Sequence, residues 1–238
     1  MAFYLIGLGL NEKSITAEAL EAIKTCSKIY LENYTVDFPY SIDKLENQLE
    51  KKIIPLNREE VESERFLEDA KKDDIVLLVY GDVLAATTHI SLILKCEKEG
   101  IKYKVIHNAG IFNAVSETGL QMYKFGKTAS LPKWQENYHP DSFMDIIKDN
   151  LKINAHTLLL VDIGLDFEKV KEELKTAAGN KKVFLDKVIV CSNLGNEKKK
   201  IYYEKPDNIN DIEKPFCLVI PGKLNEMEKE ALSEIANL

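Results

Sequence analysis

Short apolar runs alternate with amphipathic stretches along the first half of this chain. The apolar runs predict strands at residues 3–8, 28–32, 53–54, 75–80 and 103–107. Between them, apolar positions recur with helical spacing, which predicts helices at residues 15–24, 42–49, 61–71 and 89–98. Strands that alternate with helices favour a mostly parallel sheet with helices on both faces. The continuous apolar run at residues 76–79 fits a strand that is covered on both sides.

The pattern changes after Asn108. We predict a short helix at 111–117, a strand at 126–131, a helix at 142–150, a strand at 157–163, a helix at 167–177 that ends at Gly179-Asn180, strands at 188–191, 201–204 and 217–220, and a last helix at 226–235. No helix separates the first two of these last three strands, so we expect antiparallel pairing there. The chain is therefore predicted to be an α/β protein of two domains, residues 1–110 with a mostly parallel sheet and residues 111–238 with a mixed sheet.

Charge and hydropathy narrow the classes of partner. The 238 residues carry a formal net charge of -7, which disfavours binding to nucleic acid, and no nucleic-acid partner is expected. Lys198 to Lys200 is the only tight basic run and is typical of a solvated edge strand or hairpin. The longest internal apolar run, at residues 75–80, is far below the roughly 18 residues of a membrane helix. Residues 1–10 are too short and lack the basic start of a signal peptide, so we expect a cytoplasmic protein with no membrane contact.

Catalytic and metal-binding signatures are weak. The four cysteines lie far apart in apolar segments, which predicts buried free thiols, and the four histidines are scattered, so no metal site is predicted. The chain has no Gly-x-Ser-x-Gly elbow and no His-Glu-x-x-His motif. No catalytic residue is therefore assigned.

Small and polar residues follow three of the predicted strands, in the stretches Gly7 to Leu10, Gly81 to His89, and His107 to Ile111. In open α/β sheets, ligands bind beyond the carboxyl ends of the strands. Asp82 is placed to accept hydrogen bonds from a ligand amine or hydroxyl, and Gly110 leaves room for a flat ring or a backbone contact. His107 alone is more typical of a hydrogen-bonded structural histidine. The sequence therefore indicates a ligand site at this edge of the first sheet.

Several further stretches give the chain a family resemblance. They are Ala86-Thr87-Thr88-His89, Thr118-Gly119-Leu120-Gln121, Tyr123-Lys124-Phe125-Gly126, His156-Thr157-Leu158 and Pro221-Gly222-Lys223-Leu224. Together with Gly81-Asp82 they resemble the diphthine synthase family of the tetrapyrrole methylase-like superfamily, over nearly the whole chain. The resemblance implies two αβα domains with the cofactor in the cleft between them, and a homodimer. It also implies methyl transfer from S-adenosylmethionine to the amino group of the modified histidine intermediate of elongation factor 2, which gives diphthine.

The resemblance also implies a set of cofactor contacts. Residues on loops at strand ends of the first half would be Leu10, Asp82 and Ala85, followed by Gly110 and Ile111; residues on strands of the second half would be Val161, Leu194 and Phe216. The chain departs from the family where Val83 replaces the usual proline after Gly-Asp, and the second domain lacks much of the insertion after Asp162-Ile163.

Other functions stay open at this point. A methyltransferase of the same superfamily could act on a tetrapyrrole of the precorrin type, and a non-catalytic nucleotide-binding protein associated with translation would share the fold. A Rossmann-type methyltransferase would use Glu32, at the end of the second strand, to hold a ribose. That alternative is weaker, because Glu12 occupies the third glycine position of the dinucleotide fingerprint.

Overall fold

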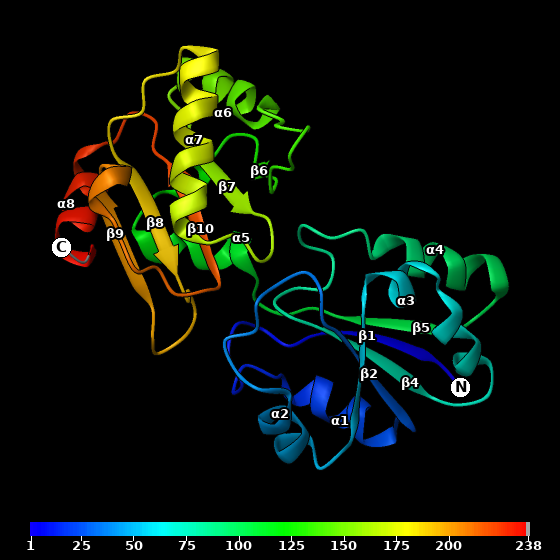
Figure 1. Cartoon of the computed structure of the whole chain (residues 1–238). Coiled ribbons are helices and arrows are strands. Elements are labelled where there is room, and N and C mark those ends of the chain that lie inside the picture. The colour runs from blue at the N-terminus through cyan, green and yellow to red at the C-terminus, as the bar shows by residue number, and fades with distance from the viewer. Residues whose placement is uncertain (237–238) are drawn as a thin grey trace. The chain divides into compact units, whose positions relative to one another are not determined.

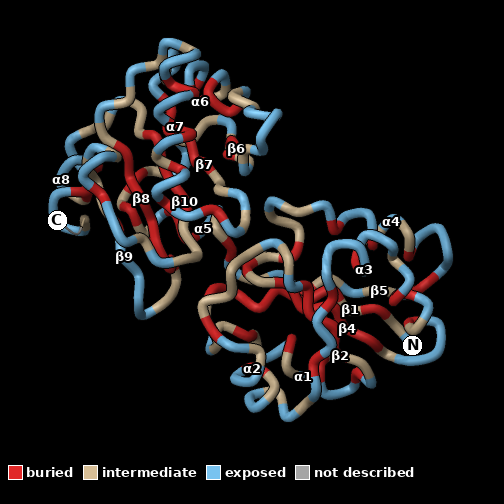
Figure 2. The backbone as a smooth tube through the Cα atoms, viewed as in Figure 1, coloured by how far each residue is buried: buried red, intermediate tan, exposed pale blue. Residues whose placement is uncertain are grey.

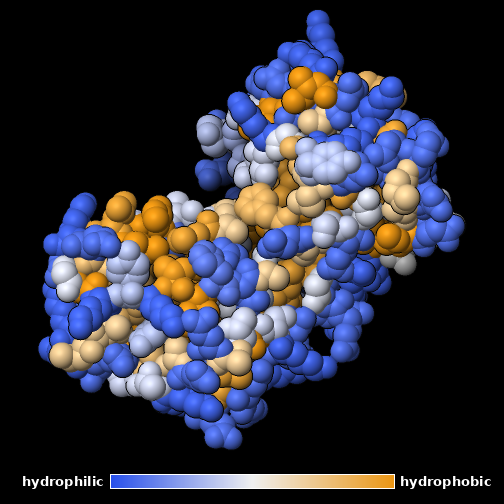
Figure 3. All heavy atoms as spheres, turned by 180° about the vertical axis from the view of Figure 1, so that it is seen from behind, coloured by the Kyte–Doolittle hydropathy of each residue, from blue (hydrophilic) through white to orange (hydrophobic). Residues whose placement is uncertain are grey.

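The computed structural model of the chain describes residues 1–236 (Figure 1). It forms two compact units, one from Met1 to Ala114 and one from Val115 onward. The predicted boundary lies after residue 110. The domain bounds 1–110 and 111–238 stay a prediction. Hydrophilic side chains are interspersed with apolar ones over the face that Figure 3 presents, as expected for charged residues on solvated helix faces. No helix within residues 1–236 is long and apolar enough to cross a membrane.

The first unit is built on a five-stranded sheet in the order β3-β2-β4-β1-β5, in which every neighbouring pair is parallel. Its strands are β1 (Phe3–Gly7), β2 (Lys28–Glu32), β3 (Ile53–Leu56), β4 (Ile75–Val79) and β5 (Tyr103–Ile106). Its helices are α1 (Ala17–Thr25), α2 (Ile42–Leu49), α3 (Arg58–Glu62), α4 (Ile90–Glu99), the short α5 (Ile111–Ala114) and the 3-10 segment η1 (Arg65–Lys71). The predicted mostly parallel sheet is confirmed.

Strand β4 shows why this sheet is covered on both faces. Its alternate residues enter two different hydrophobic clusters: Ile75, Leu77 and Val79 pack with α4 and η1, while Val76 and Leu78 pack with α1 and α2. All five residues are completely buried, and Figure 2 shows the strand in red. Such a strand has no polar face, which explains its continuous apolar sequence.

The second unit contains a mixed sheet in the order β6-β7-β10-β8-β9, with β6 and β7 parallel and the other pairs antiparallel. Its strands are β6 (Ala129–Leu131), β7 (Thr157–Val161), β8 (Val188–Ser192), β9 (Lys200–Glu204) and β10 (Phe216–Ile220). Its helices are α6 (Ser142–Lys152), α7 (Phe167–Lys181) and α8 (Glu226–Ile235), with 3-10 segments η2 (Val115–Thr118), η3 (Met122–Lys124) and η4 (Pro206–Asn208). The predicted antiparallel pairing of β8 with β9 is confirmed, and Lys200 begins the edge strand β9 as the basic run indicated.

Two predicted helices are wrong in extent. The predicted helix at 61–71 is two pieces, because a capping box at Asn57 starts α3 early and Glu64 adopts a left-handed φ of 57° before η1. The predicted end of the helix at residue 177 is also wrong. α7 continues through Gly179 and ends where Lys182 turns left-handed, because a glycine weakens a helix by only about 1 kcal/mol. The four cysteines are free and buried, as predicted.

Candidate functional site

The loops after β1 and β4 touch through their glycines. Gly9 and Gly81 exchange backbone hydrogen bonds, with N–O distances of 3.2 Å from Gly9 N to Gly81 O and 2.9 Å from Gly81 N to Gly9 O. Both glycines have left-handed φ values, 73° and 74°. A Cβ at Gly9 would lie 2.4 Å from the Ser14 Cβ. Glycine is therefore needed at position 9, because the left-handed turn packs it against Ser14 of the same loop.

Asp82 connects the loop after β4 to the loop after β5. Its Oδ1 accepts the Leu84 N–H at 3.1 Å, and its Oδ2 accepts from His107 Nδ1 at 2.8 Å and from the Asn108 N–H at 3.2 Å. Partial burial alone would raise the pKa of Asp82, but these hydrogen bonds outweigh it and lower that pKa below its ordinary value. Asp82 is therefore a carboxylate at neutral pH, and His107 Nδ1 carries the hydrogen of their bond. His107 is hydrogen-bonded, as its structural interpretation predicted.

The same loops hold the other predicted residues of the first unit close to Asp82. Leu10 follows the Gly9 bridge, and its carbonyl accepts the Tyr80 hydroxyl at 2.9 Å. Gly110 lies so near that a Cβ on it would be 3.0 Å from the Asp82 backbone nitrogen. Ile111 begins α5 directly after Gly110. Ala85 lies in the turn that follows Asp82. Because β4, β1 and β5 are neighbours in the sheet, the structure gathers all five predicted residues at its carboxyl edge.

The three predicted residues of the second unit share one end of the mixed sheet. Val161 ends β7, and Phe216 begins the antiparallel β10, which pairs Leu218 with Leu159. Phe216 is also opposite Ser192, the last residue of β8. Leu194 lies in the turn after β8, so its predicted position on a strand is wrong: the chain leaves β8 through the left-handed Asn193. These three residues are brought together at the sheet end within their own unit.

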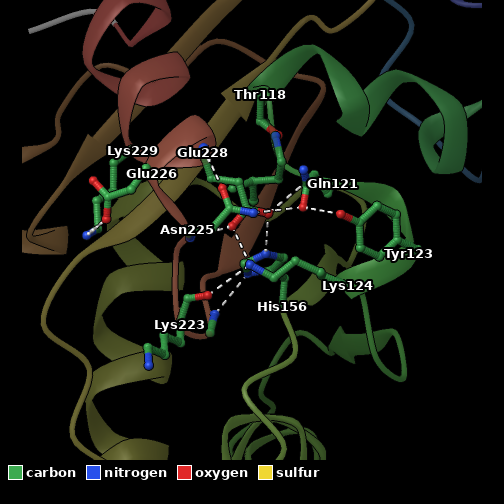
Figure 4. Close-up of polar contacts among 12 residues, drawn as sticks. Thr118, Gln121, Tyr123, Lys124, His156, Lys223, Asn225, Glu226, Glu228 and Lys229 are labelled. Atoms are coloured by element: carbon green, nitrogen blue, oxygen red, sulfur yellow. Dashed lines mark hydrogen bonds and ion pairs between the residues drawn. The ribbon is translucent and has the colours of Figure 1, made fainter.

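A buried carboxylate in the second unit gathers the other family motifs (Figure 4). Glu228, on the first turn of α8, is completely buried. Its Oε1 accepts the Gln121 N–H at 3.1 Å and faces His156 Nε2 at 3.1 Å. Its Oε2 accepts the Asn225 N–H at 3.0 Å and the Lys124 ammonium. Burial alone would raise the pKa of Glu228, but the four donors, with the Lys124 ammonium first, outweigh it and lower that pKa to about 2.

His156 is held as a neutral ring in this cluster. The Gly222 N–H donates to His156 Nδ1 at 3.0 Å, so Nδ1 carries no hydrogen and Nε2 donates to Glu228. Burial lowers the pKa of His156, and the nearby Glu228 only partly opposes that shift. Both side chains are fully buried. The cluster therefore joins α8 to the motif loops, and its central pair, His156 and Glu228, is closed to solvent.

The sequence does not single out Glu228. The stretches that contain Gln121, Lys124, His156 and Gly222 carry the family resemblance, but nothing in the sequence indicates that they meet. A signal was present in the spacing Asn225-x-x-Glu228, which forms a capping box at the start of α8. The burial and the long-range partners of Glu228 have no local signal.

Comparison with known proteins identifies the family. The family model described as Tetrapyrrole (Corrin/Porphyrin) Methylases matches residues 2–208. The chain belongs to this family. A diphthine synthase of Methanococcus maripaludis is 41% identical to it, with 96% of each chain covered. The diphthine methyl ester synthase of Bos taurus is 48% identical over 71% of this chain and 59% of its own length.

Comparison with solved structures agrees with the relatives named above. A crystal structure assigned as a diphthine synthase from Entamoeba histolytica superposes with a TM-score of 0.91 and 35% identity, covering 100% of this chain and 99% of the other. The resemblance to diphthine synthases, the α/β fold and the enzyme class, a methyltransferase, are thereby confirmed. The Rossmann-type alternative is wrong, because the chain belongs to a different methyltransferase family and Glu32 is 1% exposed.

Proposed function

We propose that this methyltransferase transfers methyl groups from S-adenosylmethionine to the amino group of the aminocarboxypropyl chain on a modified histidine of elongation factor 2, and that the product is diphthine. The observation that carries the proposal is the 41% identity over 96% of both chains to a protein named diphthine synthase. The family name alone would also fit a tetrapyrrole substrate, but the similar proteins above carry the diphthine name.

The geometry of Asp82 supports its proposed role as a cofactor ligand. An ionised carboxylate offers about four acceptor positions, and three hydrogen bonds from the protein leave room for one more donor. An amine or a hydroxyl of S-adenosylmethionine is such a donor. We propose the full set of cofactor contacts as Leu10, Asp82, Ala85, Gly110, Ile111, Val161, Leu194 and Phe216, in domains 1–110 and 111–238.

In this reaction the main task of the protein is to align the amine with the methyl group. The sulfonium of the bound cofactor supplies an electrophilic methyl group, so the chain needs to hold the amine in line with it and keep water away. The carboxylate of Asp82 adds negative charge near a cationic ligand, which favours binding. No side chain is assigned as the base that accepts the proton of the amine. The proposal includes a homodimer in the cytoplasm, by family resemblance, and light scattering on the purified chain measures the oligomeric state.

A transfer assay with labelled S-adenosylmethionine tests the proposal. Elongation factor 2 that carries the unmethylated intermediate should become labelled, and elongation factor 2 without the modification should not. Precorrin-type substrates serve as the competing test, and label on them alone would contradict the proposal. Mass spectrometry of the product counts the methyl groups. A methyl group that is released by mild base would instead indicate an ester, as in the name of the Bos taurus relative.

A further inference from the structure

Glu32 and His89 form a buried polar pair in the first unit. Glu32 ends β2 and is 1% exposed, while His89 precedes α4 and is 2% exposed. The distance from Glu32 Oε2 to His89 Nε2 is 3.7 Å. Neither of these two atoms has a hydrogen-bond partner within residues 1–236. Buried polar atoms almost always have partners, so this pair needs an explanation.

The other hydrogen bonds of the two side chains show that a hydrogen is missing between His89 Nε2 and Glu32 Oε2. His89 Nδ1 lies 3.1 Å from the Val83 carbonyl oxygen, which can only accept, so Nδ1 carries a hydrogen. Glu32 Oε1 accepts the Tyr34 N–H at 3.4 Å. With a neutral ring and an ionised carboxyl, Nε2 and Oε2 would be two acceptors facing each other. A buried acceptor without a donor destabilises the folded state. A single proton between them would turn this repulsion into a hydrogen bond after a side-chain movement of about 1 Å.

The pair connects β2 to the loop that contains Asp82 and Ala85. The Val83 carbonyl accepts both His89 Nδ1 and the Thr87 hydroxyl, which closes the loop on itself. Within the loop, Ala86 has a left-handed φ of 57°. A non-glycine residue in this conformation costs about 1–2 kcal/mol and persists only where its surroundings hold it.

We propose that Glu32 and His89 share one proton, and that this proton holds the loop at 82–89 in the shape that presents Asp82 and Ala85 to the cofactor. The effect on the cofactor rests on the proposed function. Because both side chains are buried under the loop, they act as positioning residues and touch neither the cofactor nor the substrate.

The charged groups around the pair are the same in every variant compared below. Burial, with Glu32 and Glu62 nearby, raises the pKa of Tyr34 to about 12, so this phenol stays neutral. Arg58 lies over the Tyr34 ring at 5.3 Å, and Glu62 of α3 is a further carboxyl near that ring. His107 is hydrogen-bonded to Asp82. A difference between variants of Glu32 therefore reports on the pair.

Amide hydrogen exchange tests the shared proton without any cofactor. In the wild type, the protection of residues 83–89, corrected for intrinsic rates, should equal that of Glu32→Gln within about twofold, because the shared proton supplies the donor that the amide nitrogen of the variant supplies permanently to His89 Nε2. Glu32→Leu should exchange at least about tenfold faster under the same conditions.

Glu173→Gln is the matched control, since Glu173 is also a buried glutamate with an unpartnered Oε2 but lies in the second unit. It should leave the protection of residues 83–89 unchanged. Protection in Glu32→Gln that exceeds that of the wild type by about tenfold or more overturns the proposal, because the wild-type pair would then lack the shared proton. Exchange in a folded Glu32→Leu at the wild-type rate overturns it as well.

Calorimetry with S-adenosylmethionine then tests the consequence for the cofactor. Glu32→Gln should bind within about twofold of the wild type, and a folded Glu32→Leu at least about tenfold more weakly. Equal affinity of the wild type and Glu32→Leu contradicts the positioning role. If the wild type itself binds no S-adenosylmethionine, the proposed function fails, whereas the exchange result on the shared proton still stands by itself.

Discussion

Glu228→Gln should destabilise the second unit strongly, although it changes a single oxygen to an amide nitrogen. Each carboxylate oxygen of Glu228 faces two donors, Gln121 N and His156 Nε2 on one side and Asn225 N and Lys124 Nζ on the other. A glutamine therefore places its NH₂ group against two donors whichever way it turns. Removing one partner of a buried ion pair costs about 3–5 kcal/mol.

The pKa of Glu228 gives a second measure of the same contribution. A shift from 4.5 to about 2 corresponds to about 3 kcal/mol of stability at neutral pH. Because the folded pKa is lowered, the unfolded chain binds a proton more readily than the native one. This contribution is therefore complete above about pH 4.5 and is lost as the pH falls toward 2.

Calorimetric unfolding of the wild type and the variant measures the effect. At neutral pH the melting temperature should fall by about 10 °C, taking about 2–4 °C for each kcal/mol in a chain of this size. Glu226→Gln on the same helix is the control, because the Glu226 side chain is 91% exposed and pairs with Lys229 at the surface. The control should melt like the wild type. If Glu228→Gln melts like Glu226→Gln, or keeps the acid dependence of the wild type between pH 4.5 and 2, the account of the cluster is refuted.

Other single substitutions distinguish residues that affect cofactor binding from residues that affect only stability. Asp82→Asn should weaken binding of S-adenosylmethionine in calorimetry by about tenfold or more, since a charge-assisted hydrogen bond contributes about 1.5–3 kcal/mol. Gly179→Ala should stabilise α7 by about 0.5–1 kcal/mol in urea unfolding, because a Cβ there meets nothing within 4 Å, and should leave cofactor affinity unchanged. Gly9→Ala should lower the melting temperature clearly more than Gly100→Ala. Both glycines have a left-handed φ, but of the two only Gly9 would place the new Cβ against a neighbouring atom. Equal shifts in melting temperature would contradict this steric argument.

The predictable part of the fold is the part that local patterns specify. The apolar runs of β1, β2 and β4 identify strands buried on both faces, and the lack of a helix between β8 and β9 indicates their antiparallel pairing. The break at Glu64 has no such pattern, because a glutamate in the left-handed region depends on tertiary contacts.

The candidate site also divides into residues that local patterns predict and residues that depend on tertiary contacts. Strand-end residues such as Asp82 could be located because loops at neighbouring strand ends must meet. Apart from Asn225, the partners of Glu228 named above lie more than seventy residues away along the chain, and no local spacing joins a glutamate at the start of one helix to a histidine just before a strand. Long-range polar clusters of this kind come from packing, which a single sequence does not show.

The strand order of the first unit also bears on how the protein is made. In the sheet, β1 pairs only with β4 and β5, so Phe3 meets Ile75 and Tyr103. A ribosome releases the amino-terminal strand first, yet that strand has no partner until β4 emerges. During this interval its apolar residues are exposed to other nascent chains and to chaperones. Synthesis speed over the segment before β4 should therefore influence how much of the enzyme escapes aggregation.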